Sequence, residues 1–218
     1  EGLSYHTDMT AEQRQARALE LLEQVGIPNP PRVGRQYPHE LSGGMRQRVI
    51  IAIAIACKPP IIIADEPTTA LDVTIQAQIL DLLKDLQEET QTGIILITHD
   101  LGVVAEMADR VAVMYGGQFV EVATAEELFA NPKHPYTRSL LNSIPQENSQ
   151  DSELHVIEGV VPSLKNMPRT GCRFAARIPW IPESDHEANP VLHEVAPDHL
   201  VRCTCYKHFH FRDEEGEV

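Results

Sequence analysis

Residues 41–48 read Leu-Ser-Gly-Gly-Met-Arg-Gln-Arg, and residues 61–67, which follow one apolar run, read Ile-Ile-Ile-Ala-Asp-Glu-Pro. The first stretch predicts a helix that begins with a serine and two glycines. Free backbone N–H groups and the positive end of the helix dipole can receive a phosphate there. The second stretch predicts a short buried strand that ends in two carboxylates, Asp65 and Glu66. Together they indicate nucleotide chemistry.

Composition sets the outer limits of the interpretation. A chain of 218 residues with 42% hydrophobic content can form one substantial core and an appendage. The formal net charge of −14 argues against a general nucleic-acid binder. No apolar run approaches the roughly 20 residues of a membrane span, and the N-terminus shows no signal pattern. We therefore expect a soluble protein that docks on a membrane, if at all, through a partner.

The order of the predicted elements indicates an α/β fold. After residues 61–64, Asp72 can cap a helix with an apolar stripe, and a second buried strand over residues 94–98 delivers His99 and Asp100. Asp100 can cap the next helix, which ends at residue 107. Strand, helix, strand and helix in this order, with polar residues at the strand ends, are typical of a parallel sheet.

The flanking segments are predicted less sharply. Thr10 with Gln13, and Thr124 with Glu127, have capping-box spacing. Residues 110–115 and 118–122 around two glycines predict a hairpin. Cys57 is expected in the core, where free cysteines are commonly buried. Beyond residue 131, frequent prolines break the chain into short pieces, so we place a boundary near that residue.

With its motifs in order, the chain resembles the second part of an ATP-binding-cassette (ABC) ATPase. Residues 41–45 are similar to the signature motif of that family, residues 61–66 to its Walker B strand, residues 69–72 to its D-loop and His99 to its switch histidine. Four motifs in the family's order are far more specific than any one of them. The resemblance implies an α/β P-loop NTPase core with an α-helical signature subdomain and an irregular C-terminal extension.

The resemblance also assigns roles to residues. Asp65 would hold a hydrated Mg²⁺ on the phosphates of ATP, since Mg²⁺ prefers oxygen ligands. Glu66 would polarise the attacking water, and His99 would orient that water and the γ-phosphate. The expected nucleotide-binding positions are Ser42, Gly43, Gly44, Gln47 and Asp72.

The P-loop, the adenine-stacking aromatic and the Q-loop, which precede the signature in the family, are all missing from the sequence. A P-loop requires a Gly-Lys pair followed by Ser or Thr, and none of the five lysines follows a glycine. In the family, the signature of one subunit closes over ATP held by the P-loop of the other. We therefore expect three segments: 1–58, a helical subdomain with the signature; 59–130, the second part of the ATPase core; and 131–218, a C-terminal extension. We expect little ATP binding or hydrolysis by this chain alone.

Two further stretches narrow the resemblance. Tyr-Pro-His-Glu at residues 37–40 and Asn-Pro-Lys-His-Pro-Tyr-Thr-Arg at residues 131–138 are similar to the oligopeptide, dipeptide and nickel importer group. This implies an ATPase of a peptide importer, peripheral on the cytoplasmic side of the cell membrane. Its partners would be transmembrane permease subunits, a second ABC ATPase subunit and, indirectly, an extracytoplasmic solute-binding protein, with no nucleic acid. A plain proline-capped surface helix is the simpler interpretation of residues 131–138.

Cysteines in the tail raise the question of a metal. The spacing of Cys172, Cys203 and Cys205, followed by His208 and His210, is compatible with zinc or an iron–sulfur cluster. Some relatives in the group carry an iron–sulfur cluster on four tail cysteines. Here Ile178 and Asp185 stand where the second and third of these cysteines are expected, so we predict a tail without an iron–sulfur cluster or zinc.

Two other functions share parts of the pattern. An ATPase of a chromosome or DNA-repair complex can carry the same four motifs, but the chain shows no sustained heptad array and no basic surface. A non-catalytic interaction fragment is the other alternative, which the intact Glu66 and His99 argue against. Which solute is imported is not visible in the sequence.

Overall fold

The computed structural model describes residues 2–144 and 160–212. The chain divides into two compact units, Glu1–Met107 and Ala108–Val218. Within the described ranges, no helix is both long enough and apolar enough to cross a membrane. The division into segments 1–58, 59–130 and 131–218 stays a prediction. The predicted hairpin, which we grouped with the ATPase core, lies in the second unit, and its second strand pairs with a strand from the tail.

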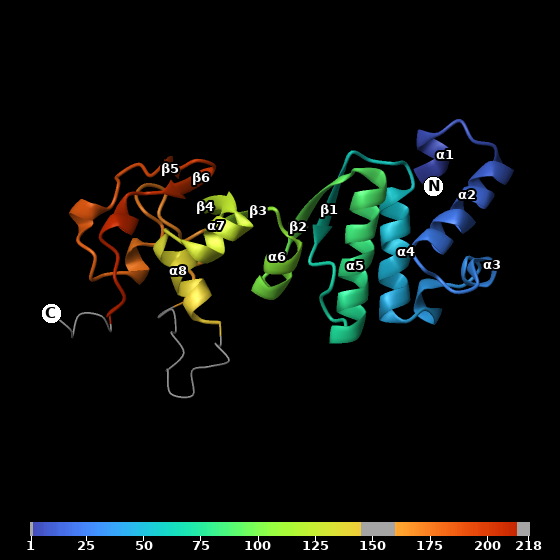
Figure 1. The fold of residues 1–218 in the computed structure, drawn as a ribbon, viewed down its shortest axis with the longest axis horizontal. Coiled ribbons are helices and arrows are strands. Elements are labelled where there is room, and N and C mark those ends of the chain that lie inside the picture. The colour runs from blue at the N-terminus through green and yellow to red at the C-terminus, as the bar shows by residue number, and fades with distance from the viewer. Residues whose placement is uncertain (1, 145–159, 213–218) are drawn as a thin grey trace. The chain divides into compact units, whose positions relative to one another are not determined.

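Helices dominate the first unit (Figure 1). Thr10 caps the second helix and Gln13 completes the predicted capping box, which confirms that expectation. The described helices of this unit are α1 (Gly2–His6), α2 (Ala11–Gln24), α3 (Pro30–Val33), a 3₁₀ turn at Pro38–Glu40, α4 (Gly43–Ile55), α5 (Val73–Thr90) and α6 (Leu101–Met107).

A parallel pair of strands carries the polar residues at their ends. Strand β1 (Ile61–Asp65) pairs with β2 (Gly93–Ile97), and the register places Asp65 opposite Ile97. The crossover between them is α5, which Asp72 caps by accepting the N–H of Ile75. The predicted strand–helix–strand unit is therefore confirmed.

Burial of these strands is one-sided. Ile62 and Ala64 pack in one apolar core with Ile79 and Leu83 of α5. Ile63, on the other face, is 66% exposed, so the expectation of a strand buried on both faces is wrong for the described residues. The physical reason is that α4 and α5 cover a single face of the sheet. Cys57 is also exposed, contrary to prediction.

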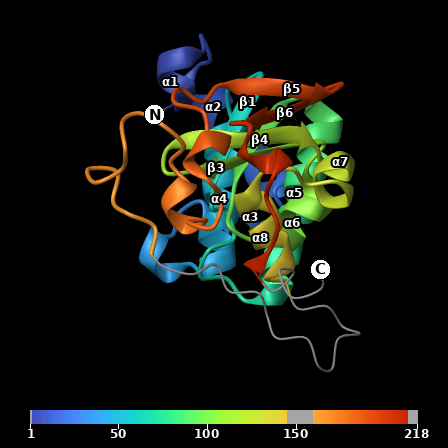
Figure 2. The same ribbon diagram turned by 90° about the vertical axis from the view of Figure 1, so that its left-hand side faces the viewer.

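An antiparallel sheet organises the second unit. Its strands are β3 (Arg110–Tyr115), β4 (Gln118–Thr124), β5 (Leu192–Ala196) and β6 (His199–Arg202), in the spatial order β3-β4-β6-β5 (Figure 2). The β3–β4 hairpin confirms the prediction. The described helices are α7 (Ala125–Ala130), α8 (Pro135–Asn142) and 3₁₀ turns at Ala175–Arg177, Glu183–Asp185 and Cys205–Lys207.

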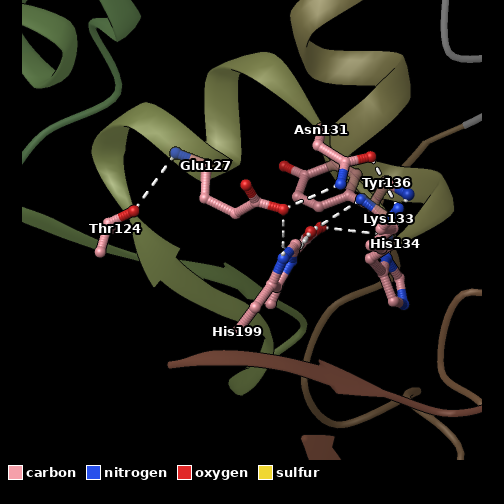
Figure 3. Close-up of polar contacts among 8 residues, drawn as sticks. Thr124, Glu127, Asn131, Lys133, His134, Tyr136 and His199 are labelled. Carbon is pink, nitrogen blue, oxygen red and sulfur yellow. Dashed lines mark hydrogen bonds and ion pairs between the residues drawn. The ribbon is translucent and has the colours of Figure 1, made fainter. Parts of the chain in front are cut away.

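A buried carboxylate ties residues 132–136, Pro-Lys-His-Pro-Tyr, to this sheet, and Figure 3 labels its partners Lys133, His134 and His199. Glu121 on β4 is fully buried, and its two oxygens accept the backbone N–H groups of Lys133 and His134 at 2.7 and 2.8 Å. The same carboxylate lies 2.7 Å from Nε2 of the buried His199. Residues 131–138 are therefore more than a surface helix, because their backbone completes a buried polar network.

Glu127 contacts the same polar network from a partly exposed position. Thr124 caps α7 by accepting the N–H of Glu127, which confirms the first half of the predicted capping box. The Glu127 carboxylate accepts a hydrogen bond from Asn131 and lies 3.3 Å from Nδ1 of His199. Both ring nitrogens of His199 thus face carboxylate oxygens, one from Glu121 and one from Glu127.

His134 makes the stability of the second unit depend on pH. Its Nδ1 accepts the N–H of Tyr136 at 3.1 Å, and burial lowers the pKa of its imidazole from 6.5 to about 3. The unfolded chain therefore binds one more proton than the folded chain between those values. The contribution of His134 to the free energy of unfolding is fully present above about pH 6.5. It falls as the pH drops towards 3, by up to about 1.4 kcal/mol per pH unit.

Fluorescence of Trp180, the only tryptophan, reports unfolding of this unit. We expect the denaturant concentration at the unfolding midpoint to decrease when the pH is lowered from 6.5 to 5. This pH range lies above the one in which Glu127, whose pKa is lowered, takes up a proton. The matched variant His134→Asn keeps a side-chain acceptor for the cap and should flatten the slope. An equal slope in both proteins would contradict the assignment to His134.

Candidate nucleotide site

The two predicted acidic residues lie at the carboxyl end of β1. Asp65 is the last residue of the strand and is exposed. Glu66 follows in the left-handed region with φ 46°, and its N–H donates to the carbonyl of Ile97 on β2 at 2.9 Å. This backbone contact fixes the point where the chain leaves the sheet, so both carboxylates stand at one end of it.

Glu66 and His99 meet although 33 positions separate them. Nδ1 of His99 lies 3.0 Å from Oε1 of Glu66, and the His99 side chain is 81% exposed. Because an ionised carboxylate only accepts hydrogen bonds, Nδ1 is the donor in this contact, and most of the imidazole remains exposed. The parallel pairing of β1 with β2 produces the meeting, since both residues follow the same end of the sheet.

Thr69 is a member of the site that sequence reasoning missed. Its hydroxyl donates to Oε2 of Glu66 at 2.6 Å. This hydrogen bond, followed by the contact with His99, lowers the pKa of Glu66. Glu66 therefore stays ionised at neutral pH, as an acceptor for a water molecule must be. The sequence signal for this contact was a hydroxyl three residues after the carboxylate, because side chains at that spacing can form a hydrogen bond.

The loop that follows is held in an uncommon conformation. Ala70 has φ 63°, so two non-glycine residues, Glu66 and Ala70, adopt left-handed backbone within five positions. Such residues cost of order 1–3 kcal/mol each and cluster at functional sites. The loop ends at Asp72, whose carboxylate caps α5 by accepting the N–H of Ile75 at 3.0 Å.

The signature residues begin α4 as expected. Ser42 is the N-cap, and its hydroxyl accepts the N–H of Met45 at 3.3 Å. Gly43 and Gly44 form the first turn, and Gln47 lies half buried one turn further on. The free N–H groups of this turn are available to an anion.

Packing gives a second reason for these glycines. A Cβ on Gly44 would meet Cγ2 of Ile75 at 2.7 Å, whereas a Cβ on Gly43 would meet Leu71 at 3.3 Å. The start of α4 therefore lies against the residues on either side of Asp72. The structure thus places the signature residues beside the D-loop, and Asp65, Glu66 and His99 at the sheet end.

Gly44→Ala is expected to destabilise the first unit by about 1–3 kcal/mol, because the new methyl group overpacks against a β-branched side chain. Chemical unfolding followed by circular dichroism measures the change. Gly43→Ala is the matched control. Its contact is looser and alanine favours the helix by about 1 kcal/mol, so we expect little loss. Equal losses in the two variants would remove the packing explanation.

Two family models and several curated proteins match the sequence of this chain. Residues 1–69 match the ABC transporter family, and residues 120–180 match the C-terminal region of oligopeptide/dipeptide transporters. The oligopeptide transport ATP-binding protein OppD of Lactococcus lactis is 56% identical over 216 residues, 99% of this chain and 64% of that protein. The dipeptide transport ATP-binding protein DppD of Haemophilus influenzae is 51% identical over 203 residues, 93% of this chain and 61% of that protein.

A solved structure supports the same fold. An ABC transporter of the metal-chelate type in an inward-facing conformation superposes with a TM-score of 0.52 at 27% identity, over 58% of this chain and 50% of that one. The chain spans somewhat under two thirds of the length of the curated relatives above. It has an α/β ABC ATPase fold and is, over nearly its whole length, a homologue of the ATP-binding subunits of oligopeptide and dipeptide ABC transporters.

Proposed function

We propose that this chain is part of the ATP-hydrolysing subunit of a peptide importer, which couples ATP binding and hydrolysis to solute uptake. The observation that carries the proposal is the hydrogen bond of Glu66 with His99 at the carboxyl end of β1. It sets an ionised carboxylate beside an imidazole whose other nitrogen is free to meet a phosphate. Peptide as the solute rests on the names of the relatives.

Each predicted site residue has a distinct task in this proposal. Asp65 would hold Mg²⁺ through its waters, a role that suits an exposed carboxylate at a strand end. Glu66 would accept a hydrogen bond from the attacking water, and His99 would orient that water and the γ-phosphate. Thr69 would keep the carboxylate of Glu66 in place.

The signature residues would act on a second site. Ser42, Gly43 and Gly44, with Gln47 and Asp72 nearby, would close over ATP that a second ABC subunit presents. The N-terminus of α4 would offer N–H groups to the phosphates. A pair of such subunits would then dock on transmembrane permease subunits at the cytoplasmic side of the membrane and, through them, serve a solute-binding protein.

Energetics explain why we expect these 218 residues to bind ATP poorly by themselves. A helix N-terminus contributes about 0.3–1 kcal/mol to an anion, and up to about 2 kcal/mol when partly buried. Micromolar binding requires about 8 kcal/mol. The sequence contains no Gly-Lys pair followed by Ser or Thr that could supply the difference.

Calorimetric titration with MgATP tests the proposal. We expect no measurable binding to the 218-residue chain and clear binding to a version extended by the P-loop segment of a relative. The extended protein should also hydrolyse ATP. Tight binding by the short chain, or an extended protein that binds without ever hydrolysing, would overturn the respective part of the proposal.

A further inference from the structure

Three cysteines and one histidine of the second unit converge on one point. The side-chain ligand atoms of Cys172, His186, Cys203 and Cys205 all lie within 4.8 Å of one another. Cys203 and Cys205 are buried, and the other two are partly buried. All three thiols are free of disulfides. The convergence has no part in the proposed ATP chemistry.

Backbone contacts hold the three ligand-bearing segments together. The N–H of Gly171 donates to the carbonyl of Ala188 at 2.9 Å, which sets the Cys172 segment beside that of His186. The N–H of Glu187 donates to Sγ of Cys203 at 3.4 Å. Such an N–H···S contact is the kind that orients and stabilises a thiolate ligand.

His186 carries an unsatisfied polar atom. Its Nδ1 is buried and, among the described residues, has no hydrogen-bond partner. Buried polar atoms are nearly always paired, so an orphan needs an explanation, and a metal ion is one. His208 and His210, the histidines that spacing suggested, are not in the converging group.

The spacing of the ligands favours a single ion over a cluster. Zinc bonds thiolate at about 2.3 Å in a tetrahedron, which puts neighbouring sulfurs about 3.8 Å apart. The ligand atoms here lie within 4.8 Å of one another, so only a small contraction would bring them to the separation found around zinc. An iron–sulfur cluster inserts several irons and sulfides between its ligands and spreads them further apart.

The four-cysteine cluster of some relatives does not fit these residues. Ile178 is 2% exposed and packs in the apolar core with Phe174. Asp185 accepts a hydrogen bond from Ser184 and is outside the converging group. The sequence-based expectation of a metal-free tail considered these two positions and did not anticipate His186.

We propose that Cys172, His186, Cys203 and Cys205 form a tetrahedral site for one Zn²⁺. Three thiolates and a neutral imidazole are a typical ligand set for structural zinc. The site would carry a net charge of about −1, and Arg173 and Arg202 line the same small pocket as Cys172 and Cys203. The ion would fasten the 172 and 186 segments to the end of β6. The proposal is independent of the proposed ATPase function.

Metal analysis of protein purified without a histidine tag or chelator tests the site. We expect about one zinc per chain, no acid-labile sulfide, and after exchange with Co²⁺ the visible absorption of tetrahedral thiolate coordination. Zinc and cobalt both failing to bind would overturn the proposal. Stoichiometric iron with sulfide would also overturn it, and so would a disulfide among the three cysteines in protein kept reduced during purification. These measurements use the unaltered chain, so they do not depend on any variant folding.

Variants identify the ligands. Cys205→Ser and His186→Ala should each weaken zinc binding by at least about tenfold, measured by competition with a coloured chelator. Cys57→Ser and His39→Ala are the controls, since both residues lie in the first unit and are exposed. Zinc affinity equal in all four variants would show that the ion binds elsewhere and contradict the assignment.

Discussion

Glu66→Gln, in a version of the protein that includes the P-loop segment, is expected to slow ATP hydrolysis by about 10²–10⁴-fold. ATP binding should survive, because the amide has the size of the carboxylate and the phosphates contact other groups. The expected loss of turnover follows from the lower basicity of an amide compared with a carboxylate. Glu66 is the ionised acceptor that Thr69 and His99 hold in place, and an amide oxygen accepts a proton from water far less readily.

Steady-state turnover and equilibrium ATP binding, measured on the same preparation, separate these two effects. Glu88→Gln near the end of α5 makes the same chemical change at an exposed position outside the site and should leave turnover unchanged. An unaltered rate in Glu66→Gln would remove this residue from its assigned role. A loss of binding as large as the loss of turnover would make the role structural.

The second large effect concerns stability. Glu121→Ala is expected to lower the free energy of unfolding of the second unit by several kcal/mol, because each buried hydrogen-bonding group left without its partner costs about 1–3 kcal/mol. The change leaves the N–H groups of Lys133 and His134, and Nε2 of His199, without their buried acceptor. Unfolding monitored by Trp180 fluorescence measures it.

Glu127→Gln is the matched control, because it touches the same histidine from a side chain that is 37% exposed. We expect a much smaller loss than for Glu121→Ala, because solvent screens an exposed charge pair. If both variants lost the same stability, burial would not be the reason for the effect of Glu121. If Glu121→Ala lost nothing, the network would not hold the unit together.

Local pattern was sufficient for the elements that carry the candidate site. Short apolar runs, caps such as Asp72 and the position of the acidic pair predicted β1, α5 and β2, because these signals act within a few residues. The nearness of Glu66 and His99 also followed, since parallel strands deliver their carboxyl ends to one edge.

Burial and long-range polar contacts could not be predicted in this way. An apolar run does not say how many of its faces are covered, so the exposure of Ile63 was missed. The buried pairing of Glu121 with His199 joins residues 78 positions apart, and that separation leaves no sequence signal. His186 escaped notice because a histidine between Asp185 and Glu187 resembles part of a polar turn.

The one-sided sheet of the first unit has a practical consequence. Strands β1 and β2 pair only with each other within the described residues, so each leaves an unpaired backbone edge. Ile61, Ile63, Ile95 and Ile97 add exposed apolar side chains, each at least 48% accessible. Open edges flanked by isoleucine are templates for strand addition by another chain. At high concentration this protein should therefore tend to self-associate into β-rich aggregates. A segment that covers the exposed face and edges of the sheet would reduce this aggregation.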